Sequence, residues 1–184
     1  NISDDQVEAL IKQLPMRLTN DQAEAIAGIC QSLRSPLPMS GLLTGDVGSG
    51  KTLSFLVPMV ATHHAGKKAM LMTPNNLLIQ QVAQELAHYF PDVPVCTVTG
   101  AKGAGKGGIQ GDPNASIVIG NTALLHAMQK GKLGSMPDFL VVDEQHKFSV
   151  QQRQALMADH TNSLESTATP IPRTAALAFH GAKD

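Results

Sequence analysis

The chain has 184 residues, which corresponds to one domain at the usual scale of about 100–200 residues per domain. Its formal net charge is −1, which excludes a surface that is cationic all over but leaves room for a local basic stripe. Hydrophobic residues make up 42% of the chain and aromatic residues only 3%. A sizeable core must therefore be built mainly from aliphatic side chains and methionine.

The two cysteines give no sign of a disulfide framework. Cys30 falls in an expected helix and Cys96 in an expected strand, which favours two buried thiols. The sequence has no apolar run of about 18 residues and no signal-peptide pattern at its start. We therefore expect a cytoplasmic protein without a membrane partner.

The first part of the chain predicts two helices. Ser3 and Gln6 form a capping-box pattern, which predicts a short helix to about Leu14. Asn20 can cap a second helix with apolar residues on one face, and Pro36 ends it. These elements form an N-terminal helical prelude over residues 1–38.

Short, unbroken apolar runs alternate with helical stretches from residue 39 onward. This alternation is typical of an α/β fold with a mostly parallel sheet covered by helices on both faces. The expected strands are Gly41–Leu43, Ala69–Met72, Val95–Val98, Ser116–Ile119, Phe139–Val142 and Leu164–Thr167, and the expected helices include Leu77–Tyr89, Ala123–Gln129 and Val150–Asp159. We interpret the chain as a single domain, with residues 39–184 as its core.

A glycine-rich stretch interrupts this pattern. Gly100–Gly111 contains six glycines together with Lys102 and Lys106. Such a composition predicts a mobile loop that is too flexible to pack. Its lysines either contact phosphate groups or are simply solvated.

A phosphate-binding loop stands between an expected strand and an expected helix. The pattern G-x-x-x-x-G-K-[ST] is matched by Gly45, Asp46, Val47, Gly48, Ser49, Gly50, Lys51 and Thr52. Its glycines let backbone N–H groups converge on a phosphate at a helix N-terminus. Lys51 is expected to reach the β- and γ-phosphates of ATP, and the Thr52 hydroxyl to bind Mg²⁺. Pro58 should kink the following helix or end its first part.

An acidic pair follows the expected strand Phe139–Val142. A carboxylate at the end of a strand beside the phosphate loop is where a nucleotide-bound Mg²⁺ needs a ligand, which is the role we assign to Asp143. Glu144 is the candidate for polarising the attacking water. His146 has no ligand spacing with the other histidines, which argues against zinc. Lys51, Asp143 and Glu144 are thus the candidate catalytic residues.

The order of further motifs resembles that of superfamily 2 helicases. These motifs are Leu18-Thr19 with Gln22, the phosphate loop, Thr73-Pro74, Thr99-Gly100, Asp143-Glu144-Gln145-His146 and Thr167-Ala168-Thr169-Pro170-Ile171-Pro172-Arg173-Thr174. The last two motifs are similar to those of RecG helicases and of the related transcription-repair translocases. The resemblance covers nearly the whole chain and implies a RecA-like P-loop domain, the first lobe of a two-lobed motor.

The resemblance also implies roles for individual residues. Gln22 would read the adenine, while Thr52 and Asp143 would hold Mg²⁺. Contacts with the DNA backbone are implied for Pro74, Gln81, Thr99, Gly100, Asn121 and Thr122, and coupling between the two sites for His146, Thr167, Ala168 and Thr169. The implied activity is an ATP-dependent DNA helicase of recombination or repair, whose second lobe belongs to the same parent protein and is absent from this chain.

Several positions depart from the family pattern. The family has Thr-His where this chain has Asn121-Thr122, and Thr-Glu where it has Asn75-Asn76. The stretch Leu53–Met59 is closer to DEAD-box helicases, which leaves a DEAD-box-like RNA helicase lobe as an alternative. Another alternative is a nucleotide-binding switch or scaffold without turnover of its own. A small-molecule kinase is disfavoured because it has no use for the Thr99 and Thr167 motifs.

Overall fold

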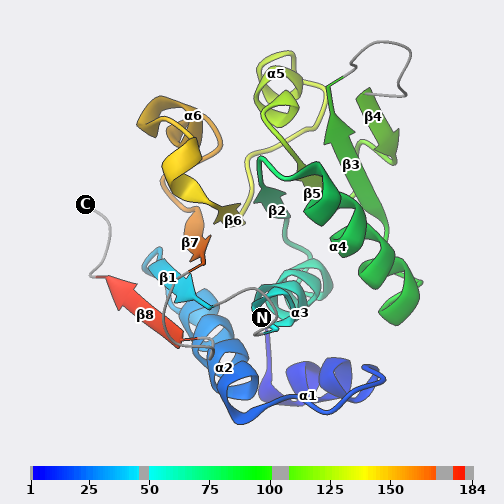
Figure 1. The fold of residues 1–184 in the computed structure, drawn as a ribbon, viewed down its shortest axis with the longest axis vertical. Helices are drawn as coiled ribbons and strands as arrows, with labels where there is room; N and C mark the ends of the chain where they lie inside the picture. Colours follow the sequence, from blue (N-terminus) through cyan, green and yellow to red (C-terminus); the bar gives the residue numbers. More distant parts are fainter. Residues whose placement is uncertain (1, 46–49, 101–107, 169–175, 181–184) are drawn as a thin grey trace.

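The computed structural model describes residues 2–45, 50–100, 108–168 and 176–180, the last of these for their backbone only. The described strands form one eight-stranded sheet in the order β4-β3-β5-β2-β6-β7-β1-β8 (Figure 1). Their bounds are β1 Ser40–Thr44, β2 Ala69–Met72, β3 Val95–Thr99, β4 Gly108–Gly111, β5 Ile117–Gly120, β6 Phe139–Asp143, β7 Asn162–Thr167 and β8 Ala176–His180. The six inner strands are parallel, and only the edge strands β4 and β8 run antiparallel to their neighbours. The prediction of a mostly parallel sheet is confirmed.

Helices cover both faces of the sheet. They are α1 Asp4–Lys12, α2 Asn20–Arg34, α3 Lys51–His64, α4 Asn76–Tyr89, α5 Ala123–Gln129 and α6 Val150–Gln154, with a short 3-10 helix η1 at Gln145–Lys147. In Figure 1, α1, α2 and α3 lie below the sheet, and α5 and α6 lie above it.

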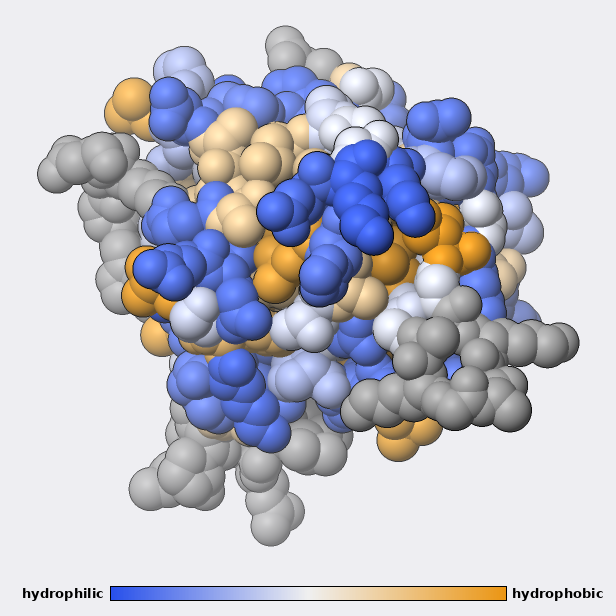
Figure 2. Space-filling model, turned by 90° about the horizontal axis from the view of Figure 1, so that it is seen from above, coloured by the Kyte–Doolittle hydropathy of each residue, from blue (hydrophilic) through white to orange (hydrophobic). Residues whose placement is uncertain are grey.

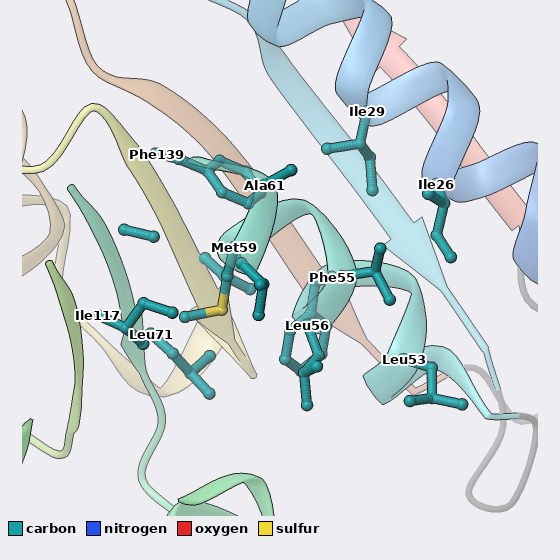
Figure 3. Packing of buried hydrophobic residues seen from close by; sticks show 14 of the residues in the cluster. Ile26, Ile29, Leu53, Phe55, Leu56, Met59, Ala61, Leu71, Ile117 and Phe139 are labelled. Atoms are coloured by element: carbon teal, nitrogen blue, oxygen red, sulfur yellow. The ribbon is translucent and has the colours of Figure 1, made fainter. Parts of the chain in front are cut away.

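Alternate residues of the central strands β2, β5 and β6 enter two separate cores. In β6, Phe139 and Val141 join the core below the sheet, whereas Leu140 and Val142 join the core above it. The lower core is centred on α3, where Phe55, Leu56 and Met59 pack against side chains of several strands (Figure 3). The period of two along a strand therefore explains why these runs are apolar throughout.

The upper face is covered less completely than the lower one. Helices α5 and α6 have only 7 and 5 residues, compared with 15 in α2 and 14 in α3. Seen from this side, apolar side chains are visible between polar ones (Figure 2).

Part of the glycine-rich stretch is ordered, which corrects the prediction of a mobile loop over Gly100–Gly111. Residues Gly108–Gly111 form β4, which pairs with β3 along its full length. The strand is held by Ile109, which packs against the upper core, and by positive φ angles at Gly108 and Gly111. A Cβ at Gly111 would lie 2.3 Å from the carbonyl oxygen of Val95, so this approach needs glycine. Lys102 and Lys106 lie outside the described residues.

Two predictions about helices are also corrected. The cap of α2 is Thr19 rather than Asn20, because the Thr19 hydroxyl accepts from the N–H of Gln22 in a full capping box. Helix α6 ends at Gln154, well short of Asp159, and the chain then turns so that Leu156 is buried.

Of the two effects predicted for Pro58, an end to helix α3 is excluded, and a kink stays a prediction. The proline removes one backbone N–H donor, yet the helix runs on to His64 because every side chain from Leu53 to Thr62 is buried. The predicted capping box at Ser3 is confirmed, as are two free, buried cysteines. Within the described part of the chain, no helix has the length and apolar character needed to cross a membrane.

Candidate functional site

The candidate residues follow the carboxyl ends of the parallel strands. Because parallel strands end at the same edge of a sheet, the loops after them share that edge. Gly45 follows β1, Thr73 follows β2, Asn121 follows β5, Asp143 ends β6 and Thr167 ends β7. Motifs that are scattered along the sequence therefore meet at one edge.

The described ends of the phosphate loop are fixed by hydrogen bonds to the rest of the site. The N–H of Gly45 donates to the carbonyl of Thr167 at 3.2 Å. Gly50 has a φ of 79°, and Lys51 and Thr52 open the first turn of α3. The candidates Asp46, Val47, Gly48 and Ser49 lie outside the described residues.

Gln22 contacts the phosphate loop directly. Its side chain is buried, its Oε1 accepts from the N–H of Thr19 at 2.9 Å, and its Nε2 donates to the carbonyl of Gly50 at 2.9 Å. A Cβ at position 50 would lie 2.2 Å from this Nε2, so the Gln22 side chain would have to shift, and the φ of 79° itself favours glycine there. The structure thus shows Gln22 bracing the loop, while its reading of adenine stays a prediction.

Asp143 is the buried carboxylate of the site, with 5% of its surface exposed. Its Oδ2 accepts from the Thr73 hydroxyl at 3.0 Å, and its Oδ1 lies 4.0 Å from Lys51 Nζ. Burial raises the pKa of Asp143 above its ordinary value, and the Thr73 hydrogen bond and the Lys51 charge oppose that rise. A cation placed beside this carboxylate would relieve the same burial cost.

Glu144, which follows Asp143, has a left-handed backbone, with φ 54° and ψ 54°. It is the only non-glycine residue with positive φ in the described part of the chain. Its N–H donates to the carbonyl of Ser166 at 2.9 Å, and its carboxylate lies 3.6 Å from Lys147 Nζ. Such a conformation costs on the order of 1–3 kcal/mol and is concentrated at functional sites.

The oxygen groups at this edge suit a magnesium ion better than a metal that takes most of its ligands from protein side chains. No group of three or more His, Cys, Asp or Glu side chains suited to a metal occurs among the described residues. Mg²⁺ in nucleotide sites needs only one or two protein oxygens, because phosphates and water supply the others. Asp143 and the hydroxyl of Thr52 are of the required type.

The predicted nucleic-acid residues divide into two groups along the same edge. In the first group, Asn75 caps α4 by accepting from the N–H groups of Leu77 and Leu78, and Asn121 Nδ2 donates to Asn76 Oδ1 at 2.9 Å. Pro74 stands directly before this cap and Thr122 directly after Asn121, whereas Gln81 lies further along α4 and is exposed.

Thr99 and Gly100 form the second group. They line an open hollow of about 620 Å³ between β3, β4 and α5. His126, Lys130 and Lys132 also line this hollow, so it carries basic groups.

The coupling candidates are only partly brought together. Thr167 joins β7 to the phosphate loop through its bond with Gly45. His146 lies in η1 and is exposed, as is Ala168, and Thr169 lies outside the described residues. The hydrogen bond from the Thr73 hydroxyl to Asp143 was not predicted from the sequence. The signal for it was a threonine directly after a strand that neighbours the one ending in Asp143.

A family model described as DEAD/DEAH box helicase matches residues 19–179. The chain belongs to the DEAD/DEAH box helicase family. It is 39% identical to the ATP-dependent DNA helicase RecG of Synechocystis sp. over 91% of the chain, and 36% identical to RecG of Streptococcus pneumoniae over 100%. The chain spans 21% and 28% of the lengths of these two relatives.

Solved helicase structures share the fold of this family member. RecG bound to a three-way DNA junction superposes with a TM-score of 0.68 at 28% identity, over 94% of this chain and 24% of that one. The UvsW helicase of bacteriophage T4 shares the fold alone, with a TM-score of 0.59 at 13% identity over 90% of this chain and 60% of that one. The resemblance to RecG is thereby confirmed, and the DEAD-box-like RNA helicase alternative is not favoured.

Proposed function

We propose that this chain is the ATP-binding motor lobe of a RecG-like DNA helicase or translocase that acts in DNA repair or recombination. The observation that carries the proposal is the placement of Lys51 at the N-terminus of α3, with its Nζ 4.0 Å from the buried carboxylate of Asp143 at the end of β6. The whole chain, residues 1–184, is proposed to form one lobe, with a second RecA-like lobe on the parent protein. A cytoplasmic location belongs to the same proposal.

The proposed work of the nucleotide site follows from its charges. Lys51 and the first N–H groups of α3 bind the phosphates, since a helix N-terminus carries partial positive charge. Asp143 and Thr52 hold Mg²⁺, which supplies charge neutralisation on the phosphate oxygens when bound. Gln22 holds Gly50 in place and is proposed to sense the base from the same position.

Glu144 is proposed to orient the attacking water. Its carboxylate lies beside Lys147, whereas that of Asp143 lies beside Lys51, so the two adjacent carboxylates can serve different atoms. The left-handed strain is held by the bond from its N–H to Ser166.

Hydrolysis by motors of this kind also uses arginines from a partner. An arginine that reaches the site in this way is worth about 10³–10⁵ in rate. We therefore propose that the lobe alone binds nucleotide but hydrolyses it very slowly. The isolated lobe would then behave like the alternative considered above, a nucleotide-binding switch without turnover of its own.

The nucleic-acid partner is proposed to lie against the loops after β2, β3 and β5. The candidate groups there are mostly neutral amides, hydroxyls and backbone N–H groups, which suit contacts to the sugar–phosphate backbone. Such contacts position a strand without reading its sequence. The partner is proposed to be DNA, as in the names of the RecG relatives.

Nucleotide binding by variants of this chain tests the proposal. We expect Mg²⁺ with a non-hydrolysable ATP analogue to bind the wild type measurably, and Lys51→Ala to lose about 1.5–3 kcal/mol of binding free energy, the value of a charge-assisted contact. Lys67→Ala is the matched control, because Lys67 is exposed in the loop after α3, away from the phosphate site. Equal affinity of the wild type and Lys51→Ala would remove Lys51 from the site.

A further inference from the structure

Thr73 stands between the two candidate sites. It directly follows β2, it is fully buried, and β2 is the neighbour of β6 in the sheet. Its hydroxyl donates to Asp143 Oδ2 at 3.0 Å and accepts from the N–H of Asn75 at 3.2 Å. A threonine hydroxyl has one donor and two acceptor positions, so both hydrogen bonds are made at once.

On the nucleotide side, this bond makes the two oxygens of Asp143 different. Oδ2 is tied to Thr73, and Oδ1 faces Lys51. Thr73 therefore contributes to fixing which oxygen is presented to the phosphate loop. A carboxylate without this anchor could rotate and exchange the two oxygens.

On the other side, Thr73 is bonded to the residue that caps α4. The backbone N–H of Asn75 donates to the Thr73 hydroxyl, and the Asn75 side chain caps the helix. The next residue, Asn76, is joined to Asn121 after β5. Asn75, Asn76 and Leu77 are exposed, and Leu77 is one of the few large apolar side chains left open to solvent.

We propose that Thr73 is a positioning residue that couples the nucleotide site to the exposed start of α4. This inference rests on the proposed function for the identity of the two ligands, a nucleotide with Mg²⁺ and a nucleic-acid strand. Because Thr73 is buried, no water replaces its hydroxyl, and a displacement of the Asp143 carboxylate is passed to the N–H of Asn75. Coupling of this kind is reciprocal, so strand binding at α4 also alters nucleotide affinity.

A purely structural role makes a different prediction. A hydroxyl that only satisfies a buried turn would, when removed, lower stability without changing how one site responds to the other. The test must therefore measure a response to nucleotide rather than stability or turnover.

Amide hydrogen exchange at Asn75, Leu77 and Leu78 gives that response. In the wild type we expect Mg²⁺ with a non-hydrolysable ATP analogue, at saturation, to slow exchange at these three amides at least threefold. Thr73→Val keeps the shape but removes the hydroxyl, and it should abolish the slowing at equal saturation. Thr73→Ser should restore it, and Thr73→Ala serves in place of Val if the Val variant does not fold.

Thr62→Val is the matched control. It also removes a buried hydroxyl, which bonds to the Pro58 carbonyl at 2.8 Å near the other end of α3. This variant should keep the nucleotide-dependent slowing at α4.

The outcomes separate the two proposals. A wild type that binds no nucleotide would overturn the proposed function and the coupling together. A wild type that binds nucleotide without slowing at α4, or a Thr73→Val variant that keeps the slowing, would overturn the coupling alone.

Discussion

The buried carboxylate of Asp143 should lower the free energy of unfolding, compared with a neutral side chain of the same shape at this position. Burial is the largest influence on its pKa and raises it, in spite of the Thr73 hydrogen bond and the Lys51 charge. Ionised Asp143 therefore costs folding free energy in the absence of ligand. We predict that Asp143→Asn, which keeps the shape and can still accept from Thr73, is more stable than the wild type at neutral pH.

The sign of the pH dependence follows from the same shift. The folded protein holds this proton more tightly than the unfolded chain, so stability is fully present below the ordinary value of 3.8 and is lost as the pH rises through the raised pKa. Asp143→Asn has no such proton to lose. The stability difference between variant and wild type should grow across this window and then stay constant up to neutral pH.

The expected magnitude is about 1.4 kcal/mol for each unit by which the pKa is raised. For a chain of this size, each kcal/mol shifts Tm by about 2–4 °C. Urea unfolding of both proteins over a pH series measures the difference, and Asp92→Asn, at an exposed position, is the control. The same Asp143→Asn variant should lose Mg²⁺-dependent nucleotide binding. A variant that is less stable than the wild type at neutral pH would refute the reasoning from burial.

Three further predictions concern turnover and nucleic-acid binding. Glu144→Gln in the full-length parent should keep ATP binding and lose hydrolysis. Normal hydrolysis in that variant would mean that another residue orients the attacking water. The isolated chain should hydrolyse ATP very slowly and respond little to DNA, since partner arginines are worth about 10³–10⁵ in rate; fast turnover by a verified monomer would contradict this. Binding of single-stranded DNA should depend weakly on salt. The double variant Lys102→Ala with Lys106→Ala should make the slope of log binding constant against log salt concentration shallower by at most about 1.4. An unchanged slope in anisotropy titrations would show that neither lysine contacts phosphate.

The central strands β2, β5 and β6 could be predicted from the sequence because they are buried on both faces. Runs such as Ala69–Met72 and Phe139–Val142 are apolar at every position, which is a local signal. The edge strand Gly108–Gly111 has no such signal, because it is half glycine and has a strand neighbour on one side only, β3. The edge strand Ala176–His180 is apolar at four of its five positions, yet it was not among the expected strands.

In the candidate site too, contiguous motifs could be predicted from the sequence, whereas contacts between distant residues could not. The phosphate loop and Asp143-Glu144 could be proposed from the sequence because each motif is contiguous. The Thr73–Asp143 bond joins residues 70 positions apart, so it depends on β2 and β6 being neighbours in the sheet. Pro58 does not end α3, since burial of the helix around it outweighs the loss of one hydrogen bond; the predicted kink is a separate effect.

ATP hydrolysis by the full-length parent protein tests the central claim most directly. The rate should be measured with branched DNA, with RNA of the same structure and without nucleic acid, for the wild type, Lys51→Ala and Lys67→Ala. The proposal of a DNA-driven motor lobe predicts that branched DNA strongly stimulates ATP hydrolysis and that RNA stimulates it little. The stimulation by DNA should be lost in Lys51→Ala and kept in Lys67→Ala. Stimulation by RNA equal to that by DNA, or undiminished hydrolysis by Lys51→Ala, would contradict it.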